Sequence, residues 1–227
     1  MRRSLTLLVA GLLGLSAGAV AQGTDWTRTF TTTPTGAFVM GNPKAAVKLV
    51  EQISYTCPHC SHFTIAAADP LRRDYVTSGK TSVEVRHAVR DRLDFTATLL
   101  ARCGGAGRFF HTSEVIMAAQ PEWVAQGAQF EQTQSAKLNG LSVTDSAKML
   151  AQASGLSALM REQGFTDGQI NACLADAKQQ KLIGEMANQA WKVKKISGTP
   201  AFMINGRDLA DTFTWAALEP QLRAAQK

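Results

Sequence analysis

The chain has 227 residues, of which 45% are hydrophobic and 19% are charged, and its formal net charge is +6 at pH 7. This composition supplies an ordinary packed core, and the length suits one large domain or one domain with an insertion. The charge excess is mild, and no basic run is interleaved with aromatic residues, so the sequence argues against nucleic-acid binding.

Residues 1–21 have the three-part pattern of a secretory signal. Two arginines follow Met1, an apolar run covers residues 5–15, and small residues end at Ala21. The apolar run is shorter than the roughly 20 residues of a membrane-spanning helix. We therefore expect cleavage after Ala21 and a mature protein, starting at Gln22, in the periplasm.

Strand and helix signals alternate in the first part of the mature chain. The threonine-rich residues 22–37 are expected to form a loose leader segment. Residues 46–53 are apolar enough for a buried strand, and β-branched residues favour a second strand over 82–89. Between them we expect a helix over residues 58–77, kinked at Pro70.

A long helical block follows, over residues 94–195. Thr166 and Gln169 have the spacing of a capping box at the start of its last helix. The block shows no internal repeat. Its amphipathic stretches cover residues 95–103, 109–119, 122–137, 146–154 and 167 onward.

Strand signals return at the C-terminal end. Residues 201–204 are apolar, Asn205-Gly206 suits a two-residue hairpin turn, and residues 207–210 can pair back. A closing helix is expected over 214–225. The order predicts an α/β fold whose core comprises residues 38–93 and 196–227, with residues 94–195 as an inserted α-helical domain.

The most informative motif is Cys57-Pro58-His59-Cys60. It follows the first predicted strand and begins a helix, where proline is favoured in the first turn. Unpaired N–H groups and the helix dipole stabilise a thiolate there, and His59 acts in the same direction. We expect Cys57 to face outward and take the mixed disulfide, and Cys60 to be shielded and to resolve it.

Other roles for these residues are weaker. A zinc site with His59 and His62 lacks a second paired set of ligands, so no metal is expected. A purely structural disulfide across so short a loop would add little stability. His87 and His111 have no partner visible in the sequence. The Thr199-Pro200 bond, on base rates alone, is expected to be trans.

Taken together, three places resemble the DsbA-like branch of the thioredoxin superfamily. The first runs from Gly41-Asn42-Pro43-Lys44-Ala45 through Leu49-Val50-Glu51 to the CPHC motif. The second is the helical insertion, and the third is Ser197-Gly198-Thr199-Pro200-Ala201-Phe202 before the hairpin turn. The resemblance implies a thioredoxin-like fold with an inserted helical domain.

The resemblance also implies an activity. Members of this branch oxidise reduced exported polypeptides by donating a disulfide, and a DsbB-like membrane partner linked to quinone reoxidises them. It implies a monomer that needs no metal and no organic cofactor. By the same comparison, Cys57 is the nucleophile and Cys60 the resolving thiol, while Pro58 and His59 tune the reduction potential.

Three further residues acquire roles through the resemblance. Pro200 is implied to be a cis proline facing the active site, which replaces the base-rate expectation, and Thr199 is implied to contact the sulfurs. Both would bind substrate. Glu51 matches an acidic residue beneath the site that exchanges protons with Cys60, a role suited to a buried carboxylate of raised pKa.

One feature leaves alternatives open. Threonine before the cis proline also occurs in disulfide isomerases of the superfamily, whereas the best-known oxidases carry valine. A disulfide isomerase or reductase is therefore one alternative, although only about 25 residues separate Gln22 from the first strand, too few for the isomerases' N-terminal dimerisation domain. A chaperone-like peptide-binding module is the other.

The remaining cysteines, Cys103 and Cys173, both fall in the helical block. In an exported chain with an even cysteine count, they are expected to form a structural disulfide. The alternative is a second redox pair that modulates the first.

Overall fold

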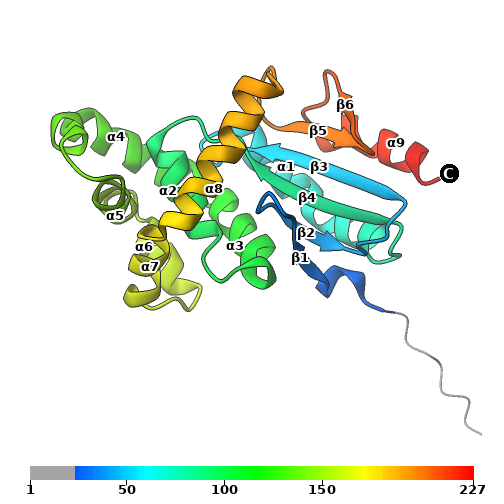
Figure 1. Ribbon diagram of the computed structural model, residues 1–227, viewed down its shortest axis with the longest axis horizontal. Helices are drawn as coiled ribbons and strands as arrows, with labels where there is room; N and C mark the ends of the chain where they lie inside the picture. Colours follow the sequence, from blue (N-terminus) through cyan, green and yellow to red (C-terminus); the bar gives the residue numbers. More distant parts are fainter. Residues whose placement is uncertain (1–23) are drawn as a thin grey trace, which may run out of the picture.

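A mixed six-stranded sheet forms the centre of the molecule in the computed structural model, which describes residues 24–227 (Figure 1). The expected signal at residues 1–21 lies outside the described residues. Across the sheet the strand order is β1-β2-β4-β3-β5-β6. The strands are β1 (Phe30–Thr32), β2 (Phe38–Gly41), β3 (Val47–Ile53), β4 (Thr81–His87), β5 (Ala201–Ile204) and β6 (Arg207–Leu209).

The central strands confirm the predicted strand–helix–strand unit. β3 and β4 pair in parallel, and all other neighbouring strands pair antiparallel. The connection between β3 and β4 begins with helix α1 (Pro58–Pro70). Six of the seven residues of β3 are buried, as expected for a parallel strand covered on both faces.

The N-terminal segment differs from the prediction. Residues 22–37 were expected to be a loose leader, but a 3₁₀ turn, η1 (Trp26–Arg28), and β1 lie within them. β1 pairs with β2, a strand that the sequence pattern did not predict. β1 is exposed or half-buried along its length, so no apolar alternation marks it, and its place is set by pairing with β2.

Pro70 lies where the α-helix passes into a different helical form. α1 ends at Pro70, and a π-helical segment, η2 (Leu71–Val76), begins at the next residue. The Thr77 amide donates to the Arg72 carbonyl, five residues back, at 2.9 Å. Proline has no N–H to donate, and local widening of the helix is one way to accommodate the lost bond. Gly79, at φ +73°, ends the segment.

The insertion is helical, as predicted, and lies to one side of the sheet in Figure 1, from which α8 runs back toward the sheet. The first four expected amphipathic stretches each form one helix, whereas the stretch from residue 167 onward divides into α7 and α8 at Ala175-Asp176. The short helix α6 was not predicted. The helices are α2 (Arg92–Ala101), α3 (Ala106–Ala118), α4 (Gln120–Asn139), α5 (Val143–Ala153), α6 (Leu156–Glu162), α7 (Asp167–Leu174) and α8 (Ala177–Asn188).

Helices cover both faces of the sheet. Glu51 of β3 lies on the face against α1 and α3, where it shares a small cavity with Phe63 and Phe109. Its neighbour Gln52 points to the other face and lines a cleft with Met186 of α8. This alternation follows from the two-residue period of a strand. Within residues 24–227, none of the helices has the length and apolarity to cross a membrane.

The C-terminal hairpin has the predicted turn. Asn205 and Gly206 both have positive φ, +51° and +81°, as the mirror-image turn of a two-residue hairpin requires. The Asn205 side chain also accepts a hydrogen bond from the Lys48 amide at 2.8 Å, which ties the turn to β3. The closing helix α9 (Trp215–Ala225) is capped by Thr214.

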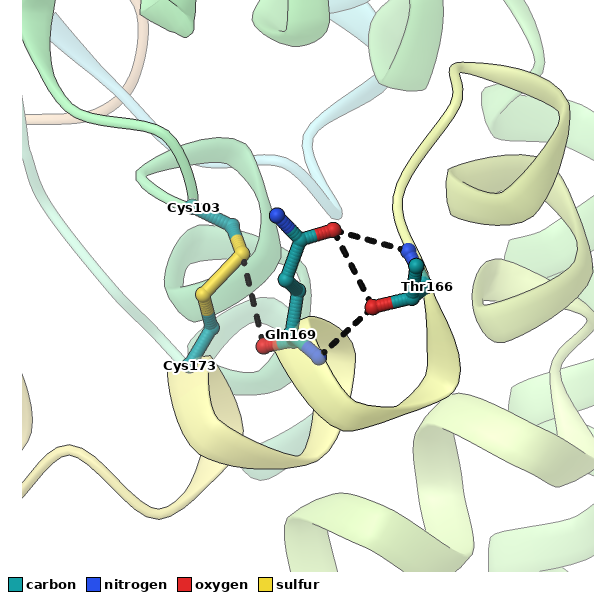
Figure 2. The surroundings of a disulfide bond; sticks show 4 residues. All are labelled: Cys103, Thr166, Gln169 and Cys173. Atoms are coloured by element: carbon teal, nitrogen blue, oxygen red, sulfur yellow. Dashed lines mark hydrogen bonds between the residues drawn. A yellow bond between two sulfur atoms is a disulfide. The ribbon is translucent and has the colours of Figure 1, made fainter.

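Cys103 and Cys173, which are 70 positions apart in the sequence, form the expected disulfide (Figure 2). Cys103 lies just beyond α2, and Cys173 lies in the last turn of α7. The capping box of Thr166 and Gln169 begins α7, as predicted. The disulfide therefore joins the beginning of the helical insertion to a helix near its end.

We expect the double variant Cys103→Ser/Cys173→Ser to unfold at a markedly lower temperature. Closing a loop of this size restricts the unfolded chain by about 4 kcal/mol in the entropy model. Thermal unfolding and the redox equilibrium of Cys57 and Cys60 against glutathione should be measured together. An unchanged melting temperature with a shifted equilibrium would show a second redox pair instead of a structural disulfide.

Candidate active site

Cys57 is the N-cap residue of α1, directly after the turn that leaves β3. Its amide donates to the Ser54 carbonyl at 3.2 Å, and Pro58 begins the helix. Cys57 has an extended backbone and makes no side-chain cap, so its sulfur lies near the free N–H groups of the first helical turn. The prediction that Cys57 faces outward is wrong, because only 4% of the residue is exposed.

The loop before β5 covers Cys57. The Thr199-Pro200 peptide bond is cis, as the family resemblance implied. The Cys57 thiol donates to the Thr199 carbonyl at 3.0 Å. Cys57 and Thr199, which are 142 positions apart in the sequence, thus meet at the Cys57 sulfur. This contact explains the burial of Cys57, which a local pattern could not reveal.

The pKa of Cys57 is lowered to about 5. The largest cause is a hydrogen bond from the Cys60 thiol, and backbone N–H groups of Cys60 and His59 add to it, whereas burial opposes it. The Thr199 hydroxyl is buried without a partner and can turn toward the thiolate, which also lowers the pKa. The Thr199 carbonyl can accept a hydrogen bond from the Cys57 thiol but not from the thiolate, so this contact works against ionisation.

Cys60 has the opposite shift. It is fully buried, and burial, followed by the hydrogen bond to Cys57, raises its pKa well above the usual range. Pro58 and His59 are exposed on the helix between the two cysteines. The contribution of His59 comes from its backbone N–H group. Both cysteines are free thiols in the structure.

Two residues of the insertion hold the turn between β3 and α1, and sequence reasoning missed both. The Gln120 amide donates to the carbonyls of Tyr55 at 2.6 Å and Cys57 at 2.9 Å. The Asp94 carboxylate accepts from the amides of Tyr55 at 2.8 Å and Arg90 at 3.0 Å. Burial raises the pKa of Asp94 to about 7. Nothing in the local sequence distinguishes Gln120 from other helix-start glutamines.

Glu51 is buried beside a cavity of about 50 Å³ between the sheet, α1 and α3. Burial, with a smaller effect from Glu114, raises its pKa to about 8. Glu114 forms an ion pair with Arg72 at the same cavity. Among the described residues, neither cysteine lines this cavity. A buried, protonatable Glu51 is therefore observed, and proton exchange with Cys60 stays a prediction.

The remaining histidines differ in burial. His62 and His111 are exposed, whereas His87 is buried between Tyr55 and Phe109 with no hydrogen-bond partner for either ring nitrogen. Burial lowers the pKa of His87 well below its usual value. In the part of the chain that the structure describes, no three His, Cys, Asp or Glu side chains gather to hold a metal ion.

A dithiol at the start of the first helix after a central strand, opposite a cis proline, defines a thioredoxin-like redox protein. The family model described as Thioredoxin matches residues 32–224, and the chain belongs to this family. The predicted fold, a thioredoxin-like core with a helical insertion, and the resemblance to the DsbA-like branch are both confirmed.

Solved structures show the same architecture. The crystal structure of a protein-disulfide isomerase from Novosphingobium aromaticivorans is 34% identical, covers 83% of this chain and 96% of that one, and superposes with a TM-score of 0.78. Wolbachia pipientis alpha-DsbA1 is 20% identical with a TM-score of 0.63 over 86% of this chain and 93% of that one, and shows the shared fold.

Curated relatives are similar in sequence. Proteins of Rickettsia typhi and Rickettsia bellii, both named as protein-disulfide oxidoreductases, are 30% and 27% identical over 169 residues. The match covers 74% of this chain and 54% and 56% of theirs. The chain thus spans about half the length of the curated relatives it matches.

Gln120→Met should destabilise the protein by about 2 kcal/mol, because two buried carbonyls lose their donor. We also expect the Cys57 thiolate pKa to move as the turn relaxes. Chemical denaturation and a pH titration of the thiolate absorbance measure both effects. Gln129→Met, at an exposed position of the same helix, is the control and should change neither the stability nor the thiolate pKa. Equal behaviour of the two variants would contradict the role of Gln120 in positioning the turn.

Glu51→Gln should stabilise the protein at pH 7 by on the order of 3 kcal/mol. The folded pKa is raised to about 8 from 4.5, so the carboxyl costs no stability below pH 4.5 and progressively more as the pH rises toward 8. Thermal unfolding from pH 4 to 8 measures the difference, which should vanish at pH 4. Glu162→Gln, at an exposed position, should show no such trend. An effect of Glu51→Gln that does not depend on pH would contradict the raised pKa of Glu51.

Proposed function

We propose that this chain is a periplasmic thiol:disulfide oxidoreductase that donates disulfides to reduced exported polypeptides. The observation that carries the proposal is the opposite shift of two adjacent thiols. The pKa of Cys57 is lowered to about 5, and that of Cys60 is raised well above its usual range. Such a pair assigns one sulfur as the leaving group and the other as the proton-holding resolving thiol.

The reaction takes two exchanges. In the oxidised enzyme, a substrate thiolate attacks the Cys57 sulfur, the bond between Cys57 and Cys60 breaks, and Cys60 leaves and takes up a proton. A second substrate thiolate then attacks the substrate sulfur of the mixed disulfide, and Cys57 leaves as a thiolate. The substrate dithiol loses two electrons and becomes a disulfide, and the enzyme gains them as the dithiol state that the structure holds.

The low pKa of Cys57 favours this direction. A thiolate that is stable at neutral pH leaves the mixed disulfide readily, and stabilising the reduced form makes the disulfide a stronger oxidant. Reoxidation then requires an electron acceptor outside the chain. A DsbB-like membrane partner linked to quinone fills this role in the proposal.

Thr199 and Pro200 form the proposed substrate-binding surface. The Thr199 carbonyl already accepts a hydrogen bond from Cys57, so a substrate segment laid along this loop brings its sulfur to the same point. Backbone groups at the cis proline pair with an extended substrate chain in the proposal, which makes recognition independent of the substrate's sequence.

A disulfide isomerase or reductase is the second candidate. Thr199 precedes the cis proline, and the Novosphingobium structure that is 34% identical is named a protein-disulfide isomerase. The two activities differ in an assay. An oxidase forms disulfides quickly in a reduced peptide and rescues scrambled ribonuclease poorly, whereas an isomerase shows the reverse.

The thiolate absorbance of the reduced protein should titrate with a midpoint near pH 5. Because Cys57 ionises at about 5 when folded and near 9 when unfolded, the reduced form should gain stability relative to the oxidised form as the pH rises from 5 to 9. Thermal unfolding of both forms across this range measures the gain. A midpoint near that of a free cysteine would refute the oxidant assignment.

Cys57→Ser should abolish peptide oxidation and the low-pH thiolate. Cys60→Ser should retain a thiolate but with a raised pKa, since the Cys60 thiol is the strongest contributor to the shift. His62→Gln, at an exposed position of α1, is the control and should retain oxidation. Peptide binding that persists at full strength in a folded Cys57→Ser protein would instead favour a chaperone-like module.

A further inference from the structure

A cleft of about 470 Å³ lies on the molecule away from the dithiol. Its walls come from the β1–β2 connection, the end of α2, the start of α3 and the first turns of α8. Neither active-site cysteine lines it, and neither does the cis-proline loop. Cys103 and Cys173 both line the cleft, and their disulfide joins the segment after α2 covalently to the last turn of α7.

The N-terminus of α3 opens into this cleft. Gly105 is its N-cap residue, no side chain caps it, and the first turn contains no acidic residue. Gly105 and Ala106 line the cleft. A Cβ placed on Gly105 or Gly107 would meet no atom within 4 Å, so space is open in front of the helix. Free N–H groups at a helix N-terminus favour an anion.

An independent observation comes from Arg102, in the wall of the same cleft. The residue is 4% exposed, yet no carboxylate of residues 24–227 forms an ion pair with it. Nε donates to the Gln179 side chain and Nη2 to the Gly36 carbonyl, each at 2.7 Å, and Nη1 is buried without a partner. The guanidinium lies 4.2 Å from the centroid of the Phe38 ring.

The remaining charges of the cleft are one cation and one carboxylate. Lys178 adds a positive charge. Asp176 is the carboxylate, and its Oδ1 accepts from the amides of Lys178 and Gln179 as the cap of α8. Burial lowers the pKa of Arg102 to about 10, with Asp176 opposing this only in part. The cleft therefore keeps an excess of positive charge.

We propose that this cleft binds a small organic anion through a carboxylate or phosphate group. The oxyanion accepts hydrogen bonds from the N-terminal amides of α3 and is attracted by Arg102 and Lys178. The cleft exceeds the size of a bare ion, and Leu99 and Leu182 in its walls offer apolar contacts to a short carbon skeleton. The guanidinium and helix N-terminus suit either oxyanion.

Amide chemical shifts of Ala106 and Gly107 test the proposal in the full oxidised chain. The probes are inorganic phosphate, glycerol 3-phosphate and succinate, titrated at constant ionic strength with sodium chloride. We expect saturable shifts with at least one organic anion and none with chloride. Tighter binding of glycerol 3-phosphate assigns a phosphate ligand, and tighter binding of succinate assigns a carboxylate ligand.

Gly107→Asp places a carboxylate in the first turn of α3 and should weaken binding at least tenfold while raising the melting temperature without ligand. Gly107→Ala is the matched control and should keep the anion response. Non-saturable shifts, or equal binding by Gly107→Asp and Gly107→Ala, would overturn the site. Equal affinity for inorganic phosphate and both organic anions would overturn the assignment to an organic ligand.

Discussion

The turn between β3 and α1 is the constraint on which the site depends. Its carbonyls at Tyr55 and Cys57 are held by Gln120, and its amide at Tyr55 is held by Asp94. Both side chains come from the helical insertion. A turn carrying a reactive sulfur must stay fixed to within a fraction of an ångström for directional hydrogen bonds to act on it. The insertion therefore serves as the support of the active-site turn as well as a cover for the sheet.

Buried polar groups around this turn combine stability with chemistry. Asp94 and Glu51 are both buried, and burial raises the pKa of each, to about 7 and about 8. Both carboxyls therefore disfavour folding as they ionise at rising pH. Cys57 has the opposite effect in the reduced protein, where its lowered pKa favours the folded state. The site keeps ionisable groups that a core selected only for stability would replace.

Local rules predicted most elements correctly. The proline after Cys57, the capping box of Thr166 and Gln169, and the Asn205-Gly206 turn each act within a few residues, so their outcome is contained in the adjacent sequence. Prediction failed where pairing over distance decides. β1 has no apolar alternation, yet it joins the sheet through β2. One local feature was also missed, because the segment that follows Pro70 is π-helical.

The sequence alone determined the chemistry: a CPHC dithiol at a helix start, a proline loop before the last hairpin, and a cysteine pair for the helical insertion. These follow from residue type, spacing and family resemblance. The tertiary structure decided how that chemistry is tuned. It buried Cys57 under Thr199 and brought Gln120 and Asp94 to the active-site turn. It also left Arg102 without an ion-pair partner among the described residues, in a cleft that the N-terminus of α3 also lines. Each of these contacts joins residues tens of positions or more apart, or depends on what packing leaves unpaired, and neither property is written in a local pattern.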